Sequence, residues 1–391
     1  MEFLKPKYVR LVSTVLAVLL ALPLQWKWLT GIYSWLSPFI MLNSVFLLKS
    51  FVLLNLLGGL ILLVSFFKNR WFCRYLCPVG EGCDRISKVS KRSPSYLKRI
   101  PPFGRWLVLL SLAAAITGIP LFILLDPMAI FNGFFSALSE ETNLVVILSF
   151  LGLPIVLGAH FIYPGIWCAK ICPLGGMFDE LTRLRKFGLQ FINKKQLAVD
   201  SRKSNRRLFI ASGTGLLAGL LIPRIFQSEK VQFIRPPASL PDRLFNTLCV
   251  RCGNCIKACP TNIITHYSGK ESLTAWMTPE VTFKNGGYCK QDCNLCGTVC
   301  PSGSISPFTI PAKQTLFMAS VEIGLDKCLL TQQTECDRCK AVCSYSAIEI
   351  VQTDSFLIMK PVVDFLKCVG CGACAVVCPA DTIKMLPLAN V

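Results

Sequence analysis

The sequence is poor in histidine and in acidic residues, and each scarcity excludes a class of protein. His160 and His266 are its only histidines, and 22 Asp and Glu stand against 41 Lys and Arg in 391 residues. A bis-histidine haem b would need both of these histidines as ligands, which argues against such a haem. No C-x2-C-H stretch is present for covalent haem attachment. Haem is therefore not the expected redox group.

The surplus of positive charge is confined to the first part of the chain. Residues 1–227 hold 26 of the 41 Lys and Arg but only 9 of the 22 acidic residues. Basic stretches beside long apolar runs are typical of the cytoplasmic loops of membrane proteins. No aromatic-interleaved basic patch or recognition motif is present, so we expect no nucleic-acid partner.

Four apolar runs approach the length of about 20 residues that a helix needs to cross a bilayer. They lie near residues 9–29, 50–67, 106–125 and 143–163, in a chain of mean hydropathy +0.53. Their connections alternate in charge, since 68–105 and 168–207 carry ten Lys and Arg each, whereas 30–48 and 126–142 carry none. The positive-inside rule places the basic connections in the cytoplasm and predicts an α-helical, four-span membrane domain in residues 1–200.

A segment with the layout of a twin-arginine export signal follows this domain. Arg206 and Arg207 precede a weakly apolar, glycine-rich run at 208–222. We expect residues 201–227 to form a fifth, signal-like transmembrane anchor that carries residues 228–391 to the outer side. An interfacial or re-entrant segment is the alternative, because the run has only 15 residues.

A repeated cysteine motif lies within the membrane domain. The stretches "RWFCRYLCPVG" and "GIWCAKICPLG" both contain C-x3-C-P-x-G and supply two cysteine pairs, Cys73 with Cys77 and Cys168 with Cys172. At a helix start, residues four apart share one face, so each pair predicts two thiolates side by side. Four thiolates are the complement for one 4Fe–4S cluster, but two separate clusters stay possible. Cys83 is a possible further ligand.

The other sixteen cysteines form four blocks that start about 40 residues apart. The blocks are Cys249, Cys252, Cys255 and Cys259; Cys289, Cys293, Cys296 and Cys300; Cys328, Cys336, Cys339 and Cys343; and Cys368, Cys371, Cys374 and Cys378. The first and fourth match the ferredoxin run C-x2-C-x2-C-x3-C-P, in which three cysteines bind one cluster and the fourth binds the neighbouring cluster. Zinc competes for C-x2-C pairs, but the fourfold recurrence of this pattern favours iron–sulfur clusters.

The four blocks predict an α+β polyferredoxin domain in residues 228–391 that binds four 4Fe–4S clusters as an electron wire. An isoleucine lies five residues after the last cysteine of every block, where we expect it to shield a cluster. These residues are Ile264, Ile305, Ile348 and Ile383. The spacing leaves open whether sequential blocks pair, or the first with the fourth and the second with the third.

With these motifs in place, the chain resembles a known family. The C-x3-C-P pair resembles the membrane ferredoxin-type protein of periplasmic nitrate reductase systems and the membrane part of the nitrous-oxide reductase regulator. The twin arginines and four blocks resemble the exported polyferredoxin of the nitrate system and a related pair encoded with methylamine dehydrogenase. The chain looks like a fusion of the two components. Two features depart from these proteins: no ferredoxin run follows the second C-x3-C-P, and no flavin-binding domain precedes the first span.

The resemblance implies a quinol dehydrogenase component of anaerobic respiration in the bacterial inner membrane. It would oxidise quinol, with menaquinol favoured, and deliver electrons to a periplasmic reductase or c-type cytochrome within a larger respiratory complex. It also implies nested pairing of the four blocks. An assembly or redox-maturation factor for a metalloenzyme, and a transmembrane conduit from a cytoplasmic donor, are the alternatives.

Quinol chemistry needs a proton acceptor and a nearby electron acceptor. His160 and Asp126 are weak candidates for the quinol site. Asp126, Glu140 and Glu141 lie at the predicted outer face, where they could take up protons. The predicted topology places the C-x3-C-P motifs at the inner face, about 30 Å of hydrocarbon from the polyferredoxin domain. Deep re-entrant motifs, a bridging quinone or a cytoplasmic polyferredoxin domain would each remove this gap.

Overall fold

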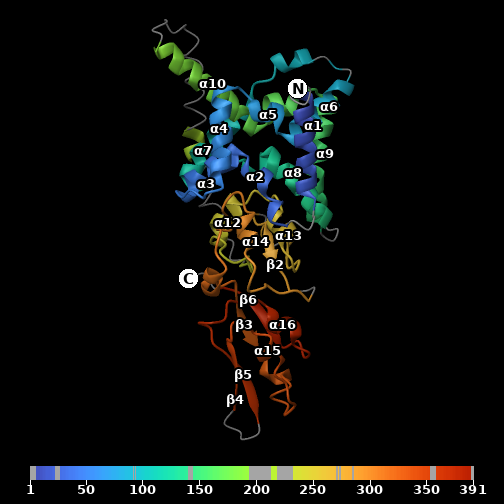
Figure 1. Ribbon diagram of the computed structural model, residues 1–391, viewed down its shortest axis with the longest axis vertical. Coiled ribbons are helices and arrows are strands. Elements are labelled where there is room, and N and C mark those ends of the chain that lie inside the picture. The colour runs from blue at the N-terminus through green and yellow to red at the C-terminus, as the bar shows by residue number, and fades with distance from the viewer. Residues whose placement is uncertain are drawn as a thin grey trace.

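The protein is described by a computed structural model in which two domains follow one another along the long axis (Figure 1). The structure describes residues 6–22, 27–90, 92, 94–139, 144–192, 213–217, 232–269, 272, 274–283, 286–352 and 358–388. The twin arginines, most of the predicted anchor, Glu140 and Glu141 lie outside these residues. We call residues 6–192 the helical domain and residues 232–388 the cysteine-rich domain.

The helical domain contains long apolar helices and several short ones packed between them. The α-helices are α1 (Pro6–Ala21), α2 (Ile32–Trp35), α3 (Pro38–Leu48), α4 (Asn55–Phe67), α5 (Trp71–Tyr75), α6 (Pro78–Val89), α7 (Phe103–Ile116), α8 (Pro127–Ser136), α9 (Leu144–Ile162) and α10 (Pro173–Ile192). Short 3-10 turns occur at Lys27–Leu29, Pro94–Lys98, Ile123–Leu125 and Ala137–Ser139, and a π-helical turn at Trp167–Ile171.

Helices form in all four runs that the sequence marks as apolar, but three of them are shorter than predicted. Among the described residues, α9 alone is long and apolar enough to cross a membrane by itself. The segment Lys27–Trp35 and α3 together meet the same criterion but are bent by 89°. Helices α1, α4 and α7 are apolar and fall below this length. Four spans therefore stay a prediction.

The cysteine-rich domain is built from two halves, each with short helices and small two-stranded antiparallel sheets. The first half contains α12 (Asp242–Leu248), α13 (Asn254–Ala258), β1 (Ile264–His266), β2 (Pro279–Val281) and α14 (Leu295–Thr298). The second contains β3 (Ala319–Ile323), α15 (Arg338–Ala341), β4 (Ile348–Gln352), β5 (Met359–Val363), α16 (Ala373–Val377) and β6 (Ile383–Pro387). Further 3-10 turns lie at Pro311–Thr315 and Leu325–Lys327.

The strands form antiparallel pairs within each half. Strand β1 pairs with β2, with Ile264 opposite Val281. In the second half β3 pairs with β6 and β4 with β5. Three of the four predicted shielding isoleucines begin strands, and all four are buried.

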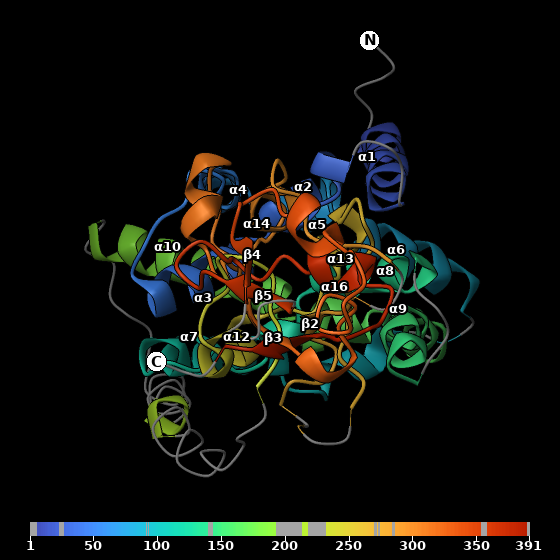
Figure 2. The same cartoon turned by 90° about the horizontal axis from the view of Figure 1, so that it is seen from below.

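The first half of the cysteine-rich domain docks directly on one end of the helical domain (Figure 1). Buried apolar side chains of both domains, including Ile40, Ala129 and Leu248, form one cluster across the boundary. Seen along the long axis, the cysteine-rich domain lies over the centre of the helical domain (Figure 2). The boundary is therefore a packed interface.

Buried polar contacts fix the position of this interface. Asn254 Nδ2 donates to Ser34 Oγ at 3.1 Å, and Ser44 Oγ donates to the carbonyl of Ser302 at 2.7 Å. Lys257, only 3% exposed, donates to the carbonyl of Ala21 at 3.1 Å. Because buried polar groups need such partners, these contacts specify one docked arrangement.

Candidate iron–sulfur sites

The two C-x3-C-P motifs meet at a single cavity in the helical domain. This four-thiol cavity has a volume of about 360 Å³. Its lining includes Cys73, Cys77, Cys168 and Cys172, together with Arg10, Arg70 and Arg74. Four thiolates and an iron–sulfur core carry net negative charge, so a lining of thiols and guanidinium groups fits such a group.

Each motif lies across a break between two helical segments. Cys73 is in α5, whereas Cys77 is the N-cap of α6, and its Sγ accepts a hydrogen bond from the Gly80 N–H at 3.3 Å. Cys172 precedes α10 in the same way and accepts from Gly175 N–H at 3.5 Å. The expectation that both cysteines of a pair lie on one helix start was therefore wrong for the first cysteine.

The proline and the glycine of the motif have separate structural roles. Proline suits the first position of the new helix because that position needs no N–H donor. A Cβ on Gly80 would lie 3.1 Å from the carbonyl oxygen of Cys73, and one on Gly175 would lie 2.9 Å from that of Cys168. Glycine thus lets the chain turn closely enough to bring both cysteines to the cavity.

Arg70 connects the two motifs. Its guanidinium donates to both carboxylate oxygens of Asp179, at 2.8 and 2.6 Å, and to the carbonyl of Cys168 at 3.1 Å. Bidentate pairing fixes geometry as well as adding energy. Arg70 therefore holds the second motif against the first.

Replacing Arg70 by methionine should loosen the cavity. We expect the free energy that stabilises the cavity to fall by about 1–3 kcal/mol, the usual cost of removing a charged hydrogen-bonded partner. The measurement is the chelator concentration that releases half of the cavity iron. Arg183→Met is the matched control, since Arg183 lies 4.0 Å from Glu180 and is 46% exposed. An equal shift in both variants would contradict the role of Arg70.

The sixteen cysteines of the cysteine-rich domain gather into four sets of four. Site A contains Cys249, Cys252, Cys255 and Cys300, and site B contains Cys259, Cys289, Cys293 and Cys296. Site C contains Cys343, Cys368, Cys371 and Cys374, and site D contains Cys328, Cys336, Cys339 and Cys378. The first three cysteines of a block thus share a site with the fourth cysteine of another block, as the ferredoxin pattern predicts.

The exchange of the fourth cysteine occurs between sequential blocks. Cys300 of the second block joins the first, and Cys259 of the first joins the second. Cys378 and Cys343 are exchanged in the same way between the third and fourth blocks. The nested pairing that the family resemblance implied is therefore wrong here, because each half of the domain closes its own two sites.

The surroundings of these thiols suit metal binding. All 21 cysteines are free of disulfides. Burial raises the pKa of Cys252 and of Cys374 to about 12, so metal must displace protons when it binds. Amide N–H groups of Ile305 and Ala347 donate to Cys300 Sγ and Cys343 Sγ at 3.4 and 3.3 Å. Such donors stabilise sulfur that carries negative charge.

The shielding isoleucines lie where the repeat predicts. Ile305 lines site A, Ile264 lines site B and Ile383 lines site D. Ile348 is in the apolar cluster that surrounds sites C and D. Their burial beside the cysteines is as predicted, and shielding of a bound cluster stays a prediction.

The five sites follow one another along the molecule. Pro127, the first residue of α8, lines the four-thiol cavity, and Ser136, its last residue, packs against Gly253 of site A. Ten helical residues span about 15 Å, roughly half of the expected hydrocarbon thickness. Sites A and B share one core, and the N–H of Cys289 in site B donates to the carbonyl of Cys371 in site C at 2.9 Å.

Asp126 does not lie at a solvated outer face. It is completely buried and caps α8, accepting from the Met128 N–H at 2.8 Å and from Ser37 Oγ at 2.5 Å. Its carboxylate is therefore occupied by helix capping. Its predicted role in taking up protons at a quinol site stays a prediction.

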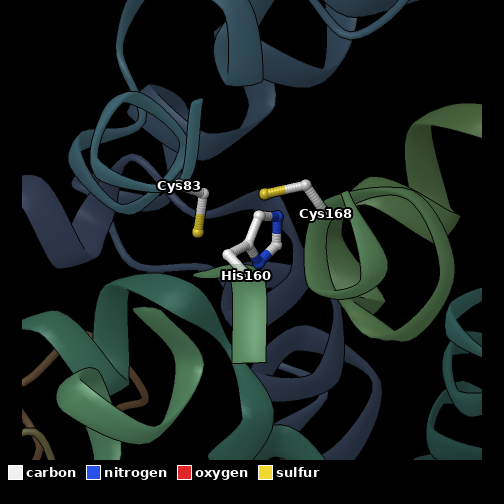
Figure 3. Close-up of side chains that lie close together, drawn as sticks. All are labelled: Cys83, His160 and Cys168. Carbon is white, nitrogen blue, oxygen red and sulfur yellow. The ribbon is translucent and has the colours of Figure 1, made fainter. Parts of the chain in front are cut away.

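His160 and Cys83 lie beside the four-thiol cavity without lining it. Both are buried, and each places a ligand atom within 4.8 Å of Cys168 Sγ (Figure 3). The sequence marked Cys83 as a possible further cluster ligand and His160 as a weak candidate for the quinol site. Their meeting could not be read from the sequence, because 77 positions separate them.

Comparison with known proteins identifies the same regions. The family described as "4Fe-4S dicluster domain" matches residues 248–304 and 334–382, and the family described as "4Fe-4S binding domain" matches residues 51–94 and 143–191. The first family matches once in each half of the cysteine-rich domain, and the second matches once around each C-x3-C-P motif. No solved structure matches the chain.

Curated relatives cover at most half of this chain but most of their own length. Ferredoxin-type protein NapF of Escherichia coli K12 is 39% identical over 150 residues, which are 38% of this chain and 82% of the relative. Ferredoxin-type protein NapG of Haemophilus influenzae is 28% identical over 220 residues, 50% of this chain and 76% of the relative. Methylamine utilization ferredoxin-type protein MauM of Methylophilus methylotrophus is 29% identical over 203 residues, 48% of this chain and 87% of the relative. With its cysteines gathered in fours and these similarities, the chain belongs to the Nap and Mau family of ferredoxin-type, 4Fe–4S electron-transfer proteins.

Proposed function

We propose that this protein is a membrane-bound electron-transfer component that oxidises quinol and passes electrons to a redox partner outside the cytoplasmic membrane. One shared cluster in the four-thiol cavity and one in each of sites A to D would form the path. A bound 4Fe–4S cluster takes up and releases one electron at a time. The protein supplies the spacing, the burial and the charge around each site.

The continuous order of the five sites carries this proposal. Helix α8 joins the cavity to site A, a shared apolar core joins A to B, and the Cys289–Cys371 hydrogen bond joins B to C. Sites C and D share the apolar cluster of the second half. Helix α8 spans only about 15 Å. A cavity that lies deep in the helical domain therefore removes the expected gap of about 30 Å between the C-x3-C-P motifs and the cysteine-rich domain without a bridging quinone.

The distribution of apolar side chains supports a membrane location. Large apolar side chains are exposed along the outward faces of three helices: Leu11, Val12, Val15, Leu16 and Leu19 in α1, Leu56, Leu60 and Leu63 in α4, and Leu144, Ile147, Leu151 and Ile155 in α9. The interior is instead polar in places, as where Ser111 Oγ donates to Asn43 Oδ1 at 2.8 Å. An apolar exterior of this extent suits lipid rather than water.

The position of the cysteine-rich domain supports its placement on the outer side. It docks on the end of the helical domain formed by α2, α3 and α8 (Figure 1). These helices belong to the connections at 30–48 and 126–142, which carry no Lys or Arg. The basic stretches around the two C-x3-C-P motifs lie toward the opposite end. The positive-inside rule assigns that opposite end to the cytoplasm.

Cations next to the sites favour acceptance of electrons. Arg10, Arg70 and Arg74 line the four-thiol cavity, and Lys257 lies between Cys255 and Cys259 at the domain interface. Lys313, 2% exposed, donates to the carbonyl of Cys293 at 2.7 Å. Each positive charge offsets the negative charge that an added electron brings.

The proposal predicts that a menaquinol analogue reduces the purified, cluster-containing protein. Quinol loses two electrons and two protons, and the electrons enter the sites one at a time. We expect the visible absorbance of the clusters to bleach with quinol as it does with dithionite. Cys77→Ala should abolish bleaching by quinol while dithionite still reduces sites A to D.

Cys374→Ala is the matched control because it removes a ligand of site C and so interrupts the electron path after site B. Quinol should then still reduce the cavity and sites A and B, but no longer site D. Ready reduction of the wild-type protein by dithionite with none by quinol would overturn the proposal.

A further inference from the structure

Three buried side chains from separate elements meet beside the four-thiol cavity. Cys83 of α6, His160 of α9 and Cys168 of the π-helical turn place one ligand atom each within 4.8 Å of the others (Figure 3). Cys83 is 0% exposed and His160 is 1% exposed. Packing of α6 against α9 brings the three together.

This cluster is poorly explained as ordinary core packing. Nδ1 of His160 is buried and has no hydrogen-bond partner among the described residues. Burying an imidazole without full hydrogen bonding costs free energy that a leucine or phenylalanine would not cost. A bound ligand that uses the imidazole and the two thiols offsets this cost.

The chemistry of the three groups selects the ligand. Two thiolates and one imidazole nitrogen form a donor set typical of zinc and of other borderline divalent ions. The negative charges of Cys83 and of the shared Cys168 offset the charge of a divalent cation, and a neutral imidazole adds none. Such a group can be buried without the penalty of an unpaired charge.

Cys168 belongs to two sets at once. It lines the four-thiol cavity with Cys73, Cys77 and Cys172, whereas Cys83 and His160 do not line that cavity. We propose that Cys83, His160 and Cys168 bind one divalent ion of the zinc class, and that Cys168 Sγ bridges this ion to the iron–sulfur group of the cavity. Metal ligation by His160 then replaces the quinol role that the sequence suggested.

The inference depends on Cys168 facing the cavity and not on the identity of the electron donor. A fixed cation bonded to a ligand sulfur withdraws negative charge from it. The iron–sulfur group beside it then accepts an electron more readily. The ion therefore has an effect on redox potential even though zinc itself does not change oxidation state.

The test uses full-length protein purified without oxygen and carrying its clusters. After equilibration with zinc and removal of loosely bound metal, elemental analysis should give about one zinc per chain. X-ray absorption at the zinc edge should show sulfur and nitrogen neighbours. Cys83→Ala and His160→Ala should each bind at least about tenfold less zinc and retain their iron.

Two further variants separate the ion from the cluster. Cys73→Ala should lose the cavity iron but keep zinc, whereas Cys168→Ala should lose both. His160→Cys should restore zinc binding, because a third thiolate is also a zinc ligand. Iron retained in sites A to D reports that each variant is folded.

Several results would overturn the inference. Wild-type protein that holds no zinc after this treatment excludes the site. So does zinc that persists in both Cys83→Ala and His160→Ala, since the ion would then be bound elsewhere. Loss of zinc in Cys73→Ala would show that the three residues do not form a separate site.

Discussion

Cys255→Ala and Cys300→Ala should each remove the same cluster, so that the double variant loses no more iron than either single variant. The two residues lie in different sequence blocks but in one site, site A. Each single substitution should release about four iron atoms per chain, the content of one cluster. Iron and acid-labile sulfide analysis gives the count, and electron paramagnetic resonance should show the same signal missing in both variants.

Cys339→Ala combined with Cys300→Ala is the matched comparison. Cys339 belongs to site D, so this double variant should release about eight iron atoms. Nested pairing of the blocks predicts the reverse, with Cys300 and Cys339 in one site. Additive loss for Cys255 and Cys300, with no additive loss for Cys300 and Cys339, would therefore contradict the sites described here.

Gly31→Leu should slow electron transfer between the two domains while leaving every cluster in place. A Cβ at Gly31 would lie 2.7 Å from the carbonyl oxygen of Val299, the residue before Cys300 of site A. Gly31 has φ −90°, which other residues also adopt, so the effect is steric rather than a backbone strain. Overpacking costs about 1–3 kcal/mol, which lowers the equilibrium constant for docking about 5- to 150-fold.

The rate of quinol-driven bleaching, relative to reduction by dithionite, measures this effect. Hydrogen exchange of the amides near Val299 gives a second measurement that does not need quinol, and exchange should become faster in the variant. Gly158→Leu is the control, because a Cβ there meets nothing within 4 Å. Equal rates and exchange in both variants would show that the packed interface does not control the transfer.

Local features of the cysteine sites could be predicted well from the sequence. The spacing of three cysteines in each block is a short-range property, and the structure places those three together in every case. The isoleucine that follows each block is buried as predicted: Ile264, Ile348 and Ile383 begin strands, and Ile305 forms a bridge with Ser239. Pro38 begins α3 and Lys49 is its C-cap, so the bounds of this helix are also visible in the sequence.

Long-range features could not be predicted in this way. The last three cysteines of every block have the same C-x2-C-x3-C spacing, which is compatible with sequential or nested exchange of the fourth cysteine. The resemblance implied the nested exchange. Asp126 was expected near solvent because a loop acid usually is, but α8 turns back into the domain and buries it. The meeting of Cys83 with His160 depends on how α6 packs against α9.

By itself, the sequence determined the chemistry of this protein: twenty cysteines at ligand spacing, apolar runs, and the sign of charge on the loops between them. These properties act over a few residues, where backbone geometry alone relates one side chain to the next. Only the tertiary structure decided which blocks exchange a cysteine, that both C-x3-C-P motifs line one cavity, and that α8 joins this cavity to site A. Those relations join residues far apart in the chain, so packing between helices and between domains sets them.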